Sequence, residues 1–205
     1  MRFRIAKPSD ARRLARAYCT CYRTAADAFL PTLGEPFLRQ YHRILLSEPS
    51  TVALVAEDDT GNVVGFACGT LDASSHLSNL KRSKWKLAIS ALPAVVKRPT
   101  LIRAMRARMN APSAASEESG FVVLSGCRLE SWGWVESERT GGQSIQLLKA
   151  WLDTSRSLGA RDIWLEVDHD SIGKLHRMMG ARVDREVVTP DGRRRRIMRY
   201  PAVDV

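Results

Sequence analysis

Residues 129–144 read LESWGWVESERTGGQS, and this stretch decides how the chain folds. It predicts a strand up to Val135, a glycine-containing turn and a helix that begins near Gly142. The apolar residues of that helix recur at helical spacing: Ile145, Leu147, Leu148 and Trp151. Such a turn leaves backbone N–H groups unpaired beside the positive end of the helix dipole, which suits a pyrophosphate. Gly141 and Gly142 let the backbone approach closely, and Arg139 adds a positive charge.

A purely structural turn is the alternative for this loop, because many strand-to-helix turns contain two glycines. The loop lacks the Gly-Lys-Ser/Thr ending of a Walker loop and the Gly-x-Gly-x-x-Gly spacing of a dinucleotide-binding fold. Nucleotide hydrolysis is therefore not expected.

Strands and helices alternate on both sides of this stretch. The preceding segments predict a strand (2–6), two helices (11–22 and 36–48) and a hairpin (51–57 and 63–69). The decisive strand is expected over 121–135, with a break near Ser125-Gly126. The following segments predict a helix (142–158), a strand (162–167), a short helix (171–179) and a second hairpin (182–188 and 194–200).

Residues 72–119 differ in character from the rest of the chain. No acid occurs between Asp72 and Glu117, and basic residues crowd in: Lys81, Arg82, Lys84, Lys86, Lys97, Arg98, Arg103, Arg106 and Arg108. The apolar residues predict two amphipathic helices, one with Trp85, Leu87, Ile89 and Leu92, the other with Leu101, Ile102 and Met105. We therefore predict one domain, residues 1–205, with a basic helical insertion at 72–119.

The chain resembles the GNAT superfamily of acyl-CoA-dependent N-acyltransferases, whose pyrophosphate loop reads Arg/Gln-x-x-Gly-x-Gly/Ala. Here Arg139-Thr140-Gly141-Gly142-Gln143-Ser144 matches, with Ser144 where Gly or Ala is usual. The order of predicted elements matches the superfamily over nearly the whole chain. The resemblance implies an α/β (α+β) fold with a mixed, mostly antiparallel central sheet flanked by helices.

The resemblance also implies an acetyl-CoA site. Backbone groups of Trp132, Gly133 and Trp134 would receive the pantetheine arm and the thioester carbonyl. Backbone N–H groups of the segment Thr140 to Ile145 would hold the pyrophosphate. Simple core packing is a further reading for the two tryptophans, since one strand face must be buried.

Glu130 alternates with Trp132 and Trp134, so we expect the three side chains on one strand face, where a carboxylate is costly unless used or paired. Glu130 resembles the proposed base of polyamine-type members of the superfamily. A desolvated Glu has a raised pKa and can take the proton of an ammonium substrate. A structural ion pair with the basic insertion is an equal alternative.

The segment 168–181 resembles the superfamily's Asn-x-x-Ala-x-x-Phe-Tyr-x-x-x-Gly-Phe, with His176 at the Tyr position and His169 at the Asn position. In the superfamily that Tyr protonates the departing thiolate of CoA, and an imidazolium can donate a proton near neutral pH. Ordinary packing of a helix histidine is the alternative for His176. For His169 we expect only a place near the pantetheine arm.

Composition limits the partners. The formal net charge is +10, from 32 Lys and Arg against 22 Asp and Glu, which favours a polyanionic partner. The basic insertion has three possible roles. It can be a solvated face whose apolar side docks on the domain, it can pack over the acceptor site and select an acidic or phosphorylated substrate, or it can contact anionic lipid through its amphipathic helices. No recognition helix or aromatic RNA-binding motif is present, so nucleic acid is not the expected partner.

The four cysteines show neither CxxC spacing nor nearby histidines at zinc-ligand spacing, so no metal is expected. We expect reduced thiols and, with no secretory signal or apolar run of about 20 residues, a cytoplasmic protein without a transmembrane segment. A homodimer would be usual for such domains.

The sequence thus favours acetyl transfer from acetyl-CoA to the primary amine of a small molecule or peptide, by direct attack in a ternary complex. No cysteine lies near the loop, so a covalent acyl-enzyme is not suggested. The alternative is an acyl-CoA-binding module with little or no turnover.

Overall fold

The computed structural model describes residues 1–23, 29–102, 122–135, 142–188 and 194–202 of the 205-residue chain. The elements in these ranges are β1 (Arg2–Ile5), the 3-10 helix η1 (Pro8–Asp10), α1 (Ala11–Cys21), α2 (Phe29–Thr32), α3 (Gly34–Leu46), β2 (Thr51–Glu57), β3 (Val63–Thr70), α4 (Ala73–Arg82), α5 (Lys84–Lys97), β4 (Cys127–Trp134), α7 (Gln143–Ser157), β5 (Ile163–Val167), α8 (Asp170–Met178), β6 (Arg182–Val188) and β7 (Arg194–Tyr200).

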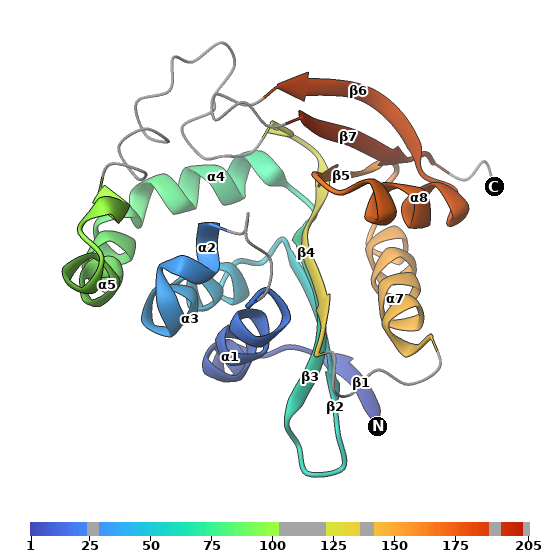
Figure 1. The fold of residues 1–205 in the computed structure, drawn as a ribbon. Helices are drawn as coiled ribbons and strands as arrows, with labels where there is room; N and C mark the ends of the chain where they lie inside the picture. Colours follow the sequence, from blue (N-terminus) through green and yellow to red (C-terminus); the bar gives the residue numbers. More distant parts are fainter. Residues whose placement is uncertain (24–28, 103–121, 136–141, 189–193, 203–205) are drawn as a thin grey trace.

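One seven-stranded sheet runs through the molecule in the order β1-β2-β3-β4-β5-β7-β6. The β4–β5 pairing is parallel, and the other five pairings are antiparallel. Helices α7 and α8 lie on one side of this sheet, and α1, α3, α4 and α5 lie on the other (Figure 1). The predicted class, a mixed and mostly antiparallel sheet flanked by helices, is confirmed.

Each side of the sheet has its own hydrophobic core. Alternate residues of β2 serve the two cores, since Val52 and Leu54 pack toward α7 while Ala53 and Val55 pack toward α1 and α3. All residues of β3 are buried. The sheet is therefore covered on both faces at β2 and β3, and these two strands are nearly continuous apolar runs.

Glycines in β3 make room for tryptophans on the α7 side. A Cβ at Gly65 would overlap the ring of Trp134, and one at Gly69 would overlap the ring of Trp151 and the backbone of β4. The Trp151 Nε1–H group donates a hydrogen bond to the Val52 carbonyl at 2.8 Å. These contacts fix α7 closely against the centre of the sheet.

The insertion begins with a helix that the sequence analysis did not predict. Helix α4 follows β3 almost directly, and the Asp72 carboxylate caps it by accepting hydrogen bonds from the N–H groups of Ser74 (3.0 Å) and Ser75 (3.2 Å). Hydrogen bonds from the Ser75 and Ser74 side chains also lower the pKa of Asp72 to about 2.

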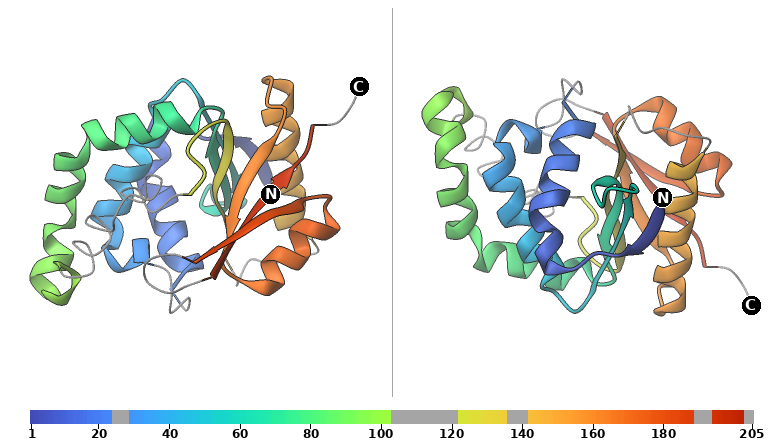
Figure 2. Two further views of the ribbon diagram at one scale, coloured as in Figure 1. Left: turned by 90° about the horizontal axis from the view of Figure 1, so that it is seen from above. Right: turned by 90° about the horizontal axis from the view of Figure 1, so that it is seen from below.

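Helix α5 corresponds to the first of the two predicted amphipathic helices and packs on α3. Leu101 and Ile102 are helical, and the rest of the second predicted helix lies outside the described residues. None of the helices in the described ranges combines the length and apolarity that crossing a bilayer requires. Viewed from above and from below, α5 lies at the outer edge of the molecule (Figure 2).

Candidate functional site

Strand β4 contains a bulge at Glu130. Leu129 pairs with Gly69 and Ser131 pairs with Cys68, so Glu130 is an extra residue in the ladder with β3. The bulge shifts the alternation of side chains by one. Leu129 and Trp132 both pack toward α7, whereas the Glu130 side chain points to α3. The expectation that Glu130 shares one face with Trp132 and Trp134 is therefore wrong.

The bulge coincides with the point where β4 and β5 separate. Parallel pairing covers Cys127–Leu129 and Ile163–Leu165, although β4 continues to Trp134 and β5 to Val167. Beyond Leu129 the β5-facing edge of β4 has left the ladder, and its backbone groups can bind a ligand or a side chain. One of the carbonyls in this part, that of Trp132, accepts a hydrogen bond from the Tyr22 hydroxyl at 3.0 Å.

Glu130 is buried in a set of polar contacts. Its side chain is 2% exposed. Arg128 Nη2 donates to Glu130 Oε1 at 2.6 Å, and the Tyr41 hydroxyl donates to Oε2 at 2.7 Å. Arg128 is itself 1% exposed and also donates to the Val123 carbonyl at 2.5 Å. Glu130 thus has an ion-pair partner on its own strand, Arg128.

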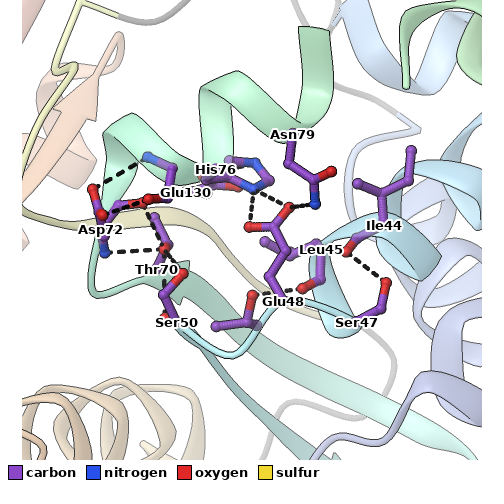
Figure 3. A network of polar contacts seen from close by, with 12 residues as sticks. Ile44, Leu45, Ser47, Glu48, Ser50, Thr70, Asp72, His76, Asn79 and Glu130 are labelled. Carbon is purple, nitrogen blue, oxygen red and sulfur yellow. Dashed lines mark hydrogen bonds and ion pairs between the residues drawn. The ribbon is translucent and has the colours of Figure 1, made fainter. Parts of the chain in front are cut away.

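Helix α4 brings a histidine to the same carboxylate. His76 Nε2 lies 3.2 Å from Glu130 Oε1, although the two atoms are not aligned as a hydrogen bond. On its other side, His76 Nδ1 lies 2.9 and 2.8 Å from the two carboxylate oxygens of Glu48, which also accepts from Asn79 Nδ2 at 2.9 Å (Figure 3). The buried polar network Arg128–Glu130–His76–Glu48 therefore joins β4, α4 and the turn after α3.

Aromatic side chains from α1 and α3 cover this network. Tyr18 stacks on Phe66 with ring centroids 5.6 Å apart and meets the His42 ring edge-on at 5.7 Å. Burial raises the pKa of Tyr18 and of Tyr41, so both remain neutral phenols. Burial also lowers the pKa of His42 to about 4. Its Nδ1 lies 2.8 Å from the Leu38 carbonyl, and its buried Nε2 has no hydrogen-bond partner among the described residues.

The tryptophans of β4 face α7. The Trp132 Nε1–H group donates a hydrogen bond to the Ser144 carbonyl at 2.9 Å, which ties the strand to the first turn of α7. Trp134 is 5% exposed and belongs to the core, as its packing interpretation predicted. Between them, a Cβ at Gly133 would lie 2.7 Å from Phe66 Cζ, so close packing alone requires glycine there.

The predicted anion-binding loop is described from Gly142 onward, and Arg139, Thr140 and Gly141 lie outside the described residues. Gly142 is the N-cap of α7 with φ 82°, a left-handed conformation that favours glycine, and no side chain caps the helix there. Among the described residues, none lies within 4 Å of where a Cβ of Gly142 would be. The first turn of α7 begins with Gln143, Ser144 and Ile145, so its N-terminal end has the geometry of an anion site.

His176 lies on α8, buried against the other end of the sheet. Its Nδ1 lies 2.7 Å from the Tyr200 hydroxyl, and its ring meets Trp132 edge-on with centroids 5.9 Å apart. Burial lowers the pKa of His176 to about 4. The ring is therefore neutral at pH 7, and donation of a proton from an imidazolium, the chemistry expected from the sequence, is opposed by this environment.

His169 is exposed at the N-cap of α8, directly after β5. It lies where β5 ends and α8 begins, on the strand that separates from β4. Its proximity to a pantetheine arm stays a prediction.

Sequence reasoning missed several side chains around the candidate residues. Arg128, Tyr41 and His76 contact Glu130, Tyr22 contacts the Trp132 carbonyl, Tyr200 contacts His176, and Glu48 contacts His76. Asp72, followed by two serines, was a usable signal for α4 and hence for the placement of His76. Nothing in the local pattern of Tyr41, Glu48 or Tyr200 distinguishes them from core or turn residues.

The four cysteines all lie in the described ranges and form no disulfide there, and Cys68 and Cys127 are buried. Burial raises the pKa of Cys68 to about 12 and that of Cys127 to about 11. Across the described ranges, no cluster of three or more metal-ligating side chains occurs.

Comparison with solved structures identifies the fold. An acetyltransferase from Corynebacterium glutamicum, described as histone acetyltransferase HPA2 and related acetyltransferase, is 18% identical, with a TM-score of 0.61 over 99% of this chain and 97% of that one. Aminoglycoside 6'-acetyltransferase type Ii is 12% identical, with a TM-score of 0.59 over 100% and 99%. The ribosomal-protein-S18-alanine N-acetyltransferase from Escherichia coli is 13% identical, with a TM-score of 0.58 over 100% and 95%.

At these identities the likeness shows the fold alone. No protein-family model matches the sequence, and no curated protein matches it. The chain has the fold of the GNAT N-acetyltransferases.

Proposed function

With the GNAT fold as the starting point, we propose that this chain transfers an acetyl group from acetyl-CoA to a primary amine by direct attack in a ternary complex. One observation supports this function above the others. Strand β4 leaves β5 after Leu129, and the freed part of β4 is tied through Trp132 to the N-terminus of α7. The strand backbone beyond Leu129 and the N-terminus of α7 thus lie side by side. In this proposal the strand backbone binds the thioester end of acetyl-CoA, and the helix N-terminus binds its pyrophosphate.

The residues present fit a CoA pyrophosphate. The N-cap glycine leaves open space at the start of α7, and no side-chain cap satisfies the first turn. We propose that backbone N–H groups of the segment Thr140 to Ser144 hold the pyrophosphate and that Arg139 adds a charge beside it. The Ile145 N–H group, which was also expected there, donates to the Gly142 carbonyl at 3.0 Å. The bound cosubstrate would supply an activated thioester carbonyl.

We propose Glu130 as the acceptor of the proton that the attacking amine must lose. Arg128 and Tyr41 each occupy one carboxylate oxygen, but a carboxylate has about four lone-pair sites, so acceptor capacity remains. The Tyr41 and Glu130 side chains lie on the α1 and α3 side of β4, opposite α7. An amine entering from this side would meet a buried carboxylate next to the separated part of β4.

His176 has a different place in the proposal. A neutral His176 holds the Tyr200 hydroxyl at 2.7 Å and packs on Trp132, so it positions the α8 side of the site. We propose a cytoplasmic location, consistent with four cysteines that form no disulfide in the described ranges.

Calorimetry with acetyl-CoA tests the cofactor site. Gly142→Asp places a carboxylate at the N-terminus of α7 and should weaken binding at least tenfold through charge repulsion. Gly159→Asp is a matched control, because Gly159 is also left-handed (φ 96°), also has open space around it and ends the same helix. Equal binding by both variants would overturn the proposed site.

Turnover with an amine panel of amino sugars, polyamines and peptide amines tests the transfer step. Glu130→Gln should lower kcat by a factor of about 10² to 10⁴ and leave acetyl-CoA affinity unchanged.

A binding module without turnover is the second candidate. The neutral His176 and the engagement of both Glu130 oxygens favour it. Wild-type binding of acetyl-CoA with no transfer to any amine of the panel would support that function in place of the first.

A further inference from the structure

We propose that helix α5 docks on an anionic lipid surface. The proposal is independent of acyl transfer and rests on the way α5 distributes its side chains. The helix has two apolar faces, of which the fold uses one.

The inner face of α5 is buried against α3. Ala91 is 1% exposed, and Leu87 packs on the core between the sheet and the helices α1 and α3. This face accounts for the attachment of α5 to the rest of the protein. This packing agrees with the interpretation of the insertion as a segment whose apolar side docks on the domain.

The outer face is an apolar stripe. Trp85 (58% exposed), Ile89 (58%), Leu92 (53%) and Val96 (77%) follow one another at intervals of four, three and four residues, which places them on one side of the helix. Large apolar side chains exposed singly are ordinary, but four in one row form a contact surface. No other described part of the chain covers the stripe. Figures 1 and 2 both place α5 at the outer edge of the molecule.

Basic side chains border the stripe and select the partner. Lys84 and Lys86 are exposed on the two sides of Trp85, and Lys97 is exposed beside Val96. Lys86 Nζ lies 5.5 Å from the centre of the Trp85 ring. Neither α4 nor α5 contains an acid. The surface that complements this helix is negatively charged beside an apolar layer.

A bilayer with anionic headgroups has this arrangement. Lysines beside a narrow stripe can reach the lipid phosphates while the apolar side chains enter the boundary between headgroups and acyl chains. Tryptophan is enriched in proteins at that depth of the membrane. A folded acidic protein would need its own apolar groove of matching width. A pair of lysines on the two sides of the stripe at Trp85 and a third beside Val96 are therefore better suited to a planar lipid surface.

Vesicle binding by the full chain tests the proposal. We expect binding to phosphatidylcholine vesicles that contain 30% phosphatidylserine and at least tenfold weaker binding to pure phosphatidylcholine. The variant Trp85→Ser/Ile89→Ser/Leu92→Ser should lose at least tenfold on the anionic vesicles. Because these side chains are exposed, its melting temperature should remain that of the wild type.

Two matched variants separate the stripe from general features. Met178→Ser/Val188→Ser removes exposed apolar side chains elsewhere, and Arg182→Glu/Arg194→Glu changes the net charge as much as Lys84→Glu/Lys86→Glu does. We expect the apolar control to bind like the wild type and the Arg182/Arg194 variant to lose much less than the Lys84/Lys86 variant. Equal losses in the two charge variants would reduce the effect to net charge and overturn the proposal.

Tryptophan fluorescence gives a readout at the stripe itself. Of the five tryptophans, Trp85 is among the exposed large apolar residues, so vesicle binding should shift its emission to shorter wavelength. Trp85→Phe should keep binding but lose the shift. A wild type that binds neither kind of vesicle would overturn the proposal. A wild-type dimer that the triple serine variant dissociates would also overturn it, because the stripe would then be a contact between two copies of the chain.

Discussion

The two faces of β4 bury different kinds of side chain. Toward α7 the strand presents Leu129, Trp132 and Trp134, which pack in an apolar core. Toward α3 and α4 it presents Arg128 and Glu130, which are as deeply buried and carry charge. The bulge at Glu130 produces this difference, because it puts the carboxylate on the opposite face from the tryptophans.

The two faces therefore depend on different kinds of neighbour. An apolar face tolerates conservative changes in shape, since any apolar neighbour contributes. The charged face is stable only while each charge keeps its partners, and those of Glu130 come from β4 itself, from α3 and from α4. We expect substitutions on the charged face to have larger effects than comparable ones on the α7 face.

The largest effect is expected for Arg128→Met. The substitution leaves Glu130 buried without its cation, and breaking a buried ion pair from one side costs about 3–5 kcal/mol of unfolding free energy. Urea denaturation at pH 7 measures the loss. The double variant Arg128→Met/Glu130→Leu should recover much of it, because the unpaired carboxylate is then absent. A single variant as stable as the wild type would show that the two faces do not differ.

The next effect is a dependence on pH, for which we compare one buried histidine from each side of the sheet. His176 faces the α7 and α8 side and His42 the α1 and α3 side, and burial lowers the pKa of both to about 4. In the unfolded chain a histidine takes up its proton near pH 6.5. Each neutral buried ring therefore contributes to the stability of the folded state above that pH. This contribution is lost as pH falls from 6.5 toward 4, by about 2 kcal/mol per histidine between pH 7 and 4.5.

Denaturation of His176→Phe and His42→Phe at the two pH values measures these shares. Each variant should lose less stability on acidification than the wild type does. His169→Gln is the control for the substitution of a histidine that is exposed. If only one of the two substitutions reduces the loss of stability on acidification, the two sides of the sheet differ in how strongly they oppose protonation of a buried histidine.

The elements of both faces were largely predictable from the sequence, whereas their side-chain contacts were not. Periodicity and turn residues located most strands and helices within a few residues, because one face of each must be buried. Helix α4 was missed because its buried apolar residues are few and its cap, Asp72, was read only as the start of a basic segment.

The network around Glu130 depends on contacts that no local pattern encodes. Tyr41 and Glu130 lie 89 residues apart in the chain, and His76 and Glu48 lie 28 apart. The bulge was also missed, although two consecutive polar residues, Glu130 and Ser131, interrupt the alternation between Leu129 and Trp132. A bulge is decided by the pairing with β3 and not by the sequence of β4 alone.

A smaller effect is expected for Tyr41→Phe. The substitution removes the hydrogen bond from the hydroxyl to Glu130 Oε2 and should cost about 2 kcal/mol, as is usual for a bond to a charged group. Tyr22→Phe is the matched comparison, because its hydroxyl donates to the neutral Trp132 carbonyl and its loss should cost about 1 kcal/mol. Thermal denaturation of the two variants ranks them. The opposite order would mean that the carboxylate does not depend on Tyr41.

The smallest effect is expected on the apolar face, for Trp132→Phe. Phenylalanine keeps most of the packing toward α7 and removes one neutral hydrogen bond to the Ser144 carbonyl, so about 1 kcal/mol of unfolding free energy should be lost. The same bond fixes the first turn of α7, where the proposed pyrophosphate site begins. Acetyl-CoA affinity should therefore fall by a few fold in calorimetry, while affinity in Tyr22→Phe stays that of the wild type. A loss of stability as large as that of Arg128→Met would show that the apolar face depends on specific partners as much as the charged face does.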